Sequence, residues 1–185
     1  MGDPKKLRKK YVPPRHPWQG SRILAEKPLI SEYGLKNKKE IYKAQSLLRN
    51  FTKQAKNLTA FKTSQRDIER KQLLQKLSKL NLIDVNSSLE QVLGINLKDI
   101  LDRRLQTLVY KKGLAKSVNQ SRQFITHGHI LVKGLKINVP GYLVKLEEEN
   151  DIEFIKDSSL SNPEHPERII KEKVELKKEI NPNIE

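Results

Sequence analysis

Apolar residues recur at helical spacing over most of the chain between residues 37 and 126. In the stretch 37–58 the apolar positions are Ile41, Ala44, Leu48, Phe51, Ala55 and Leu58. Asn37 and Glu40 have the spacing of a capping box at the start of this stretch. The opposite face carries Lys39, Lys43, Arg49, Lys53 and Lys56. The pattern predicts an amphipathic helix whose polar face is basic.

A second helix is expected over residues 64–80, where Ser64 is the candidate N-cap. Its apolar stripe consists of Ile68, Leu73, Leu74, Leu77 and Leu80. The stripe covers fewer than three heptads, so it favours a core face over a dimer zipper. A short helix near Ser88–Leu93 should follow, with Gly94 as a left-handed cap.

Two further helices are predicted between residues 96 and 128. Asn96 can cap the first, which continues through 100–112 and ends at Gly113. The stretch Ser117–Gln120 has the form of a second capping box, and that helix should end before Gly128. Only about four residues join the two helices, which predicts a tight helical hairpin.

The pattern changes from helical to alternating after Gly128. Ile130 and Val132 should face one way, with His129, Leu131 and Lys133 on the other side. Turn dipeptides at 133–134 and 140–141 separate further short strands. We expect those strands at 135–139, 142–146 and 152–155. The acidic stretch 147–151 should separate the last two, with Glu147–Glu149 as a solvated turn.

The order of elements predicts an α+β protein. A mostly helical N-terminal domain precedes a compact helix–helix–β-hairpin module with short antiparallel strands. We expect four parts: a basic extended arm (1–35), a helical domain (36–97), the module (98–156) and a charged tail (157–185). Pro13, Pro14 and Pro17 forbid a continuous helix in the arm. The tail has little apolar mass, so it should be mobile or dependent on a partner.

Charge narrows the choice of partner. The net charge is +15; residues 1–75 contain 19 basic and 6 acidic residues, and residues 100–146 contain 9 and 1. Two basic regions indicate two contact surfaces on a polyanion, most simply a nucleic acid. No apolar run approaches about 18 residues and no signal-peptide core is visible, so we expect a soluble intracellular protein. The chain has no cysteine, which excludes disulfides and thiolate metal sites.

Candidate contact residues are donor-rich. Arginine binds phosphate bidentately, lysine supplies point charge, and glutamine or histidine can bond sugar hydroxyls and base edges. In the module they are Arg103, Arg104, Lys111, Lys112, Lys116, Gln120, Arg122, Gln123, His127, His129 and Lys133. In the arm they are Lys5, Lys6, Arg8, Lys9, Lys10, Arg15 and Trp18. Such a surface fits structured RNA better than a DNA major groove, although the arm could instead be a solvated tail.

The helical wheel separates the arginines from the core. Leu101, Leu105, Leu108 and Val109 form an apolar arc that should pack on Phe124 or Ile125. Arg103 and Arg104 fall about a third of a turn away, so we expect both to be exposed. Replacing Arg104 with alanine should then weaken RNA binding and leave the fold intact.

Two histidines around Gly128 leave several interpretations open. His127 and His129 could ligate a metal, act in acid–base catalysis, contact RNA or cap the helix, or simply pack. No third histidine, cysteine or acid lies nearby in the sequence, which favours RNA contact or capping. Asp102 is expected to be a structural partner of a base. No catalytic acid pair or glycine-rich phosphate loop is visible, so we expect no enzymatic activity, no metal and no cofactor.

The stretch "LDRRLQTLVYKKGLAKSVNQSRQFITHGHILVKGLKINVPGYLV" resembles the S-four RNA-binding module. "GDPKKLRKKYVPPRHPW" and "YGLKNKKEIYKAQSLLRNF" are similar to the S-four family of small-subunit ribosomal proteins in its archaeal and eukaryotic form. The resemblance covers roughly residues 1–156. The chain is short and lacks the long eukaryotic extension, which favours the archaeal type.

The resemblance implies a structural protein of the small (30S) ribosomal subunit in the cytoplasm. It implies primary binding of 16S rRNA, nucleation of the subunit body and, with proteins S-five and S-twelve, an influence on translational accuracy. Its RNA contacts carry over to Arg103, Arg104, Lys111, Arg122, Gln123, His127, His129 and Lys133. Some bacterial relatives bind zinc through N-terminal cysteines, which this chain lacks. The alternatives are an RNA-modifying enzyme or a stand-alone RNA-binding factor that uses the same module.

Overall fold

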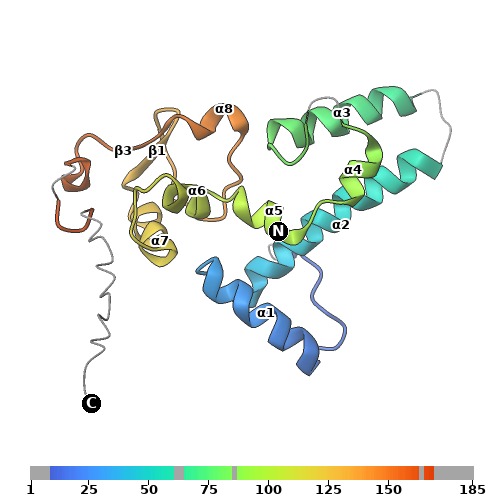
Figure 1. The fold of residues 1–185 in the computed structure, drawn as a ribbon, viewed down its shortest axis with the longest axis horizontal. Coiled ribbons are helices and arrows are strands. Elements are labelled where there is room, and N and C mark those ends of the chain that lie inside the picture. The colour runs from blue at the N-terminus through green and yellow to red at the C-terminus, as the bar shows by residue number, and fades with distance from the viewer. Residues whose placement is uncertain (1–8, 61–64, 85–86, 163–164, 169–185) are drawn as a thin grey trace, which may run out of the picture.

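A computed structural model describes residues 9–60, 65–84, 87–162 and 165–168. The N-terminal elements are α1 (Gly20–Glu32), α2 (Lys38–Ala60), α3 (Arg66–Lys79), α4 (Leu89–Leu93) and α5 (Leu97–Asp102). The remaining elements are α6 (Leu105–Lys111), α7 (Val118–Thr126), β1 (Ile130–Val132), β2 (Leu135–Lys136), α8 (Leu146–Glu149), β3 (Ile152–Phe154) and the 3₁₀ turn η1 (Ser159–Ser161). Helices α2, α3 and α4 lie on one side and the α6–β3 module on the other, with α5 between them (Figure 1). The predicted α+β fold is confirmed.

Helix α2 is the centre of the N-terminal half. It contacts α1, α3, α4 and α5. Of its predicted apolar positions, Ile41, Ala44, Phe51, Ala55 and Leu58 are buried and Leu48 is half-buried. All five bases on the opposite face are exposed. The predicted amphipathic helix with a basic outer face is therefore confirmed.

Helix α3 covers α2 with a narrower face than expected. Leu73 and Leu77 are buried, but Ile68 is 59% exposed, so its assignment to the apolar stripe is wrong. At about 100° per residue, Ile68 is about 140° away from Leu73 around the helix, whereas Leu77 is only about 40° away. Ser64, the expected cap, is outside the described residues, and Gln65 occupies the N-cap position. Gly94 has a φ of −81°, so the expected left-handed cap is also wrong.

The single helix expected over 100–112 is broken at residues 103–104. Arg104 has extended backbone angles (φ −73°, ψ 142°) and forms an antiparallel bridge with Leu143. The segment 140–144 supplies the competing partners: Leu105 N donates to the Tyr142 carbonyl at 2.8 Å, and Val144 N donates to the Arg103 carbonyl at 3.1 Å. These contacts replace intrahelical bonds, because a backbone donor that leaves the helix must find another acceptor.

Helices α6 and α7 pack on each other as the predicted hairpin, and their apolar residues join those of the sheet. Phe124 and Ile125 are buried in the second core together with Ile130 and Val132 of β1. The sheet order is β2-β1-β3, with both pairs antiparallel. Ser117 Oγ accepts a bond from Gln120 N at 3.2 Å, which confirms the predicted cap of α7.

Glycines follow the C-terminal ends of α6 and α7, and a side-chain cap precedes α5. Gly113 and Gly128 both have φ above +70°, a conformation that suits a helix end and is strained for residues with a Cβ. The predicted cap at Asn96 is present in the form of a capping box, with Asn96 N donating to Asp99 Oδ2 at 2.8 Å.

The strand expected at 142–146 and the solvated turn expected at Glu147–Glu149 are not formed. Only the Arg104–Leu143 bridge is β-like, and Leu146–Glu149 is helix α8. Glu148 is buried: its Oε2 accepts from Tyr142 Oη at 2.8 Å and from Lys145 N at 3.2 Å. The acidic stretch is thus a capped helical turn, because the buried Glu148 carboxylate accepts hydrogen bonds from Tyr142 and Lys145.

The arm and the tail are more structured than expected. Residues 20–32 form α1, so the extended arm of 1–35 is wrong over this range, whereas residues 9–19 contain no helix. Pro28 lies inside α1, past its first turn. In the tail, Leu160 is buried and the Arg168 guanidinium lies 4.8 Å from the Phe154 ring centroid. No helix in the described part of the chain is long and apolar enough to cross a membrane.

Candidate nucleic-acid interface

The exposed donors of the module gather around α7 and the corner that follows it. Gln123 and His127 are exposed, and Gln120 and His129 are half-buried. The α7 cap at Ser117 fixes the start of the helix, and the left-handed Gly128 turns the chain into β1. Lys133 follows at the tip of the β1–β2 hairpin.

Arg103 is not an exposed donor, contrary to the sequence expectation. The residue is 7% exposed. Its Nη1 donates to Glu149 Oε2 at 2.7 Å and its Nη2 donates to the Val144 carbonyl at 3.2 Å. The guanidinium therefore joins the α5–α6 break to α8.

Arg104 is likewise buried, at 6% exposure, so the second expectation of exposure is wrong. Its Nη2 donates to Glu40 Oε2 at 2.6 Å. Arg122 Nη2 donates to the other oxygen, Glu40 Oε1, at 2.7 Å. The helical wheel failed for these arginines because the helix breaks where they occur, and because the wheel contains no information about a carboxylate on α2.

Glu40 remains ionised in this environment. Burial alone would raise its pKa, but the hydrogen bonds and charges of Arg122 and Arg104 outweigh that effect and hold the pKa below its usual value. The sequence pattern indicated a helix cap for Glu40. Its carboxylate instead joins side chains 64 and 82 residues further along the chain.

The remaining lysines of the predicted site are exposed. Lys111 and Lys133 pair loosely with Asp102 (3.3 Å) and Glu147 (3.4 Å). Lys116 Nζ donates to the Pro166 carbonyl at 2.7 Å, and Lys112 is exposed at the C-cap of α6. Exposed pairs of this kind are weak and easily exchanged for a phosphate.

The two histidines have different surroundings. Their ring centroids are 6.4 Å apart. His129 Nδ1 lies 2.9 Å from Ser158 Oγ, and its ring meets Phe124 edge-on at 6.5 Å. His127 is exposed at the C-cap of α7. No group of three or more His, Cys, Asp or Glu suited to a metal ion occurs among the residues that the structure describes.

The described part of the arm lies against α2. Val12 N donates to Ser46 Oγ at 3.0 Å, and the Tyr11 ring centroid is 6.4 Å from that of Tyr42. The predicted contact residues Lys9, Lys10, Arg15 and Trp18 are exposed, Trp18 at 89%. The other predicted arm residues, Lys5, Lys6 and Arg8, lie outside the described residues.

A second basic surface lies on α2. The sequence predicted a basic helix face here, but its residues are not among the candidate contacts given above. We call it the α2 basic face; it consists of Lys39, Lys43, Arg49, Lys53 and Lys56. None of these side chains forms an ion pair with another described residue. The sequence does contain a signal for this surface: the stretch has few acidic residues that could pair with its lysines and arginine.

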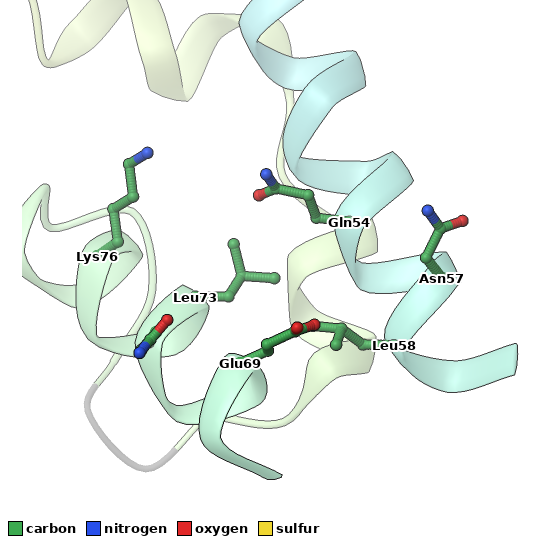
Figure 2. Close-up of a pocket in the computed structure, with 7 residues that line it drawn as sticks. Gln54, Asn57, Leu58, Glu69, Leu73 and Lys76 are labelled. Atoms are coloured by element: carbon green, nitrogen blue, oxygen red, sulfur yellow. The ribbon is translucent and has the colours of Figure 1, made fainter. Parts of the chain in front are cut away.

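The pocket between α2 and α3 has a different character (Figure 2). Its volume is about 450 Å³, and Leu73 of α3 points toward α2 across it. Its lining residues are Gln54, Asn57, Leu58, Glu69, Gln72, Leu73 and Lys76. The lining contains one carboxylate, so it offers no carboxylate pair for acid–base catalysis.

Comparison with known proteins identifies the family. A model of the S4 domain family matches residues 103–150. The small ribosomal subunit protein uS4 of Nanoarchaeum equitans is 47% identical over 93% of this chain and 97% of its own length. The uS4 proteins of Methanococcus maripaludis (47%; 91% and 95%) and Ignicoccus hospitalis (48%; 83% and 93%) are similar over comparable lengths. The chain therefore belongs to the uS4 family of small ribosomal subunit proteins, in its archaeal form, as its motifs predicted.

Proposed function

We propose that this protein is a structural constituent of the small ribosomal subunit that binds 16S rRNA directly. The observation that carries the proposal is 47% identity to a uS4 protein over nearly the full length of both chains. The protein would act in the cytoplasm as part of the subunit, through binding and without catalysing a reaction.

Two exposed basic surfaces support this function physically. The α2 basic face and the donors around α7 lie on different halves of the chain. A protein that neutralises phosphates with lysine and arginine releases counterions, which drives binding. Gln123, His127 and the half-buried Gln120 add donors that suit sugar hydroxyls and base edges.

The finer roles rest on the family resemblance. We propose that binding helps to nucleate the subunit body, and that contacts with proteins S-five and S-twelve influence translational accuracy. A membrane or DNA partner forms no part of the proposal.

Filter binding to a 16S rRNA fragment between 50 and 200 mM salt tests the mechanism. Affinity should fall steeply with salt, and Lys53→Ala should reduce the logarithmic slope by roughly 0.7–0.9, the value for one phosphate contact. Lys98→Ala is the matched control, because Lys98 is on α5, outside the α2 basic face and away from the α7 donors. An affinity that barely responds to salt would contradict phosphate contact.

Sedimentation of cell extracts tests the location. The protein should travel with mature small subunits. Association only with stalled large subunits would instead support a stand-alone RNA-binding factor.

A further inference from the structure

Three side chains from three elements meet between the two halves of the molecule. Glu40 lies in the first turn of α2, Arg104 at the N-cap of α6, and Arg122 on α7. Both Glu40 oxygens accept from a guanidinium, at 2.6 Å and 2.7 Å. We call these residues the Glu40 triad. Its side chains are 16%, 7% and 22% exposed, so the contacts are largely shielded from solvent.

A buried glutamine extends the same junction. Gln106 is 1% exposed, and its Nε2 donates to the Gly34 carbonyl at 3.1 Å and the Val118 carbonyl at 3.0 Å. Arg122 Nη1 donates to Gln106 Oε1 at 3.3 Å, which links the glutamine to the triad. The α1–α2 turn approaches α7 so closely that a Cβ at Gly34 would lie 2.6 Å from Asn119 Oδ1.

Apolar packing contributes little at this junction. The first hydrophobic core is built from residues 33–101, and the second from residues 105–160. Among the described residues after 101, only Leu143 packs against the first core. The hydrophobic effect is non-directional, and here it acts mainly within each half. Outside the approach of α8 to α3 and the α5–α6 connection, the orientation of the halves therefore depends on directional polar contacts.

We propose that Glu40 is a positioning residue for RNA binding, which holds the α2 basic face and the α7 donors in one fixed relative orientation through Arg104 and Arg122. The proposal rests on the proposed function, because it concerns how both surfaces engage one rRNA. If only a fraction of molecules has the competent orientation, the apparent affinity falls to that fraction of its full value. A preorganised pair of surfaces avoids this loss.

The direction in which one substitution changes RNA affinity separates this role from an effect of net charge alone. Glu40→Gln raises the net charge by one, so charge alone predicts equal or tighter RNA binding. The positioning role predicts weaker binding, by about tenfold if the competent orientation drops to about a tenth of molecules. Glu90→Gln is the matched control: Glu90 is exposed on α4, the charge change is identical, and affinity should stay equal or rise slightly.

A distance measurement on the free protein supplies a second readout. The chain has no cysteine, so Asn57→Cys on α2 and Lys156→Cys after β3 provide the only labelling sites. Spin labels at these exposed positions should give one narrow distance distribution, which Glu40→Gln broadens and Glu90→Gln leaves unchanged. A narrow, unshifted distribution in Glu40→Gln overturns the proposal, as does RNA binding as tight as that of Glu90→Gln.

Folding of the variants is checked by circular dichroism. If Glu40→Gln does not fold, Arg122→Lys takes its place, because lysine keeps the charge but loses the two-pronged contact. It should broaden the distance distribution, and an unchanged distribution overturns the proposal. If the unsubstituted protein fails to bind 16S rRNA, the proposed function is wrong, whereas the distance measurement still decides the orientation.

Discussion

Replacing Arg104 with alanine should destabilise the fold. The substitution removes a 2.6 Å charged hydrogen bond to Glu40 from a residue that is almost fully buried. A hydrogen bond to a charged group contributes about 1.5–3 kcal/mol, and removing one partner of a fully buried pair costs about 3–5 kcal/mol. Glu40 keeps Arg122 as a partner and retains some contact with solvent, so the smaller range applies. We expect a loss of about 2–3 kcal/mol in the free energy of unfolding.

Urea denaturation followed by circular dichroism measures this loss. With a urea m value of about 2 kcal/mol per M, the midpoint should fall by about 1–1.5 M. Urea is preferred to guanidinium chloride because it leaves the ion pair unscreened. Lys112→Ala is the control, since Lys112 is exposed and its replacement should change stability by less than about 0.5 kcal/mol.

One result would refute the reasoning directly. If Arg104→Ala keeps the wild-type midpoint and weakens only RNA binding, the guanidinium is free for RNA. The helical wheel would then have been right about its exposure, and the ion pair with Glu40 would contribute nothing to the fold.

Three further outcomes are expected. Phe124→Ala should destabilise the module by about 3–5 kcal/mol, because the ring is buried against Phe154; an unchanged melting temperature would contradict this. The pKa of Glu40 is held below its usual value, so its stabilising contribution should be complete above about pH 4.3 and be lost as the pH falls further. Acid unfolding curves should therefore be shallower for Glu40→Gln, and parallel curves would oppose this. Glu167→Gln should tighten RNA binding about two- to fivefold in filter assays, because Glu167 Oε2 accepts from Gln120 at 2.8 Å; weaker binding would argue against that competition.

Local patterns gave the parts of the fold that depend on near neighbours in the sequence. The buried face of α2, the cap at Ser117 and the alternation of β1 were all predicted, because each follows from helical or strand periodicity and from side chains a few residues apart. Ile68 shows the limit of this approach: it is apolar and lies in a helix, but its angle around α3 turns it toward solvent.

The candidate site was predicted less completely. Residue type and motif pointed to the lysines of the module, Gln123 and His127 as candidate RNA contacts, and the structure shows that these side chains are exposed. The burial of Arg103 and Arg104 was missed, because it requires the segment 140–144 to interrupt the helix and carboxylates elsewhere to receive the guanidinium groups. Residue type alone cannot tell a surface arginine from one paired inside the protein.

The sequence by itself determined the family, the helix and strand periods, the hydrophobic faces and the basic character of this protein. These properties depend on composition and on contacts within a few residues. Only the tertiary structure decided which cations remain free for RNA, because Glu40 meets Arg104 and Arg122 across 64 and 82 residues. A buried charge requires a partner of opposite sign, and the identity of that partner is fixed only when the two halves of the chain come together.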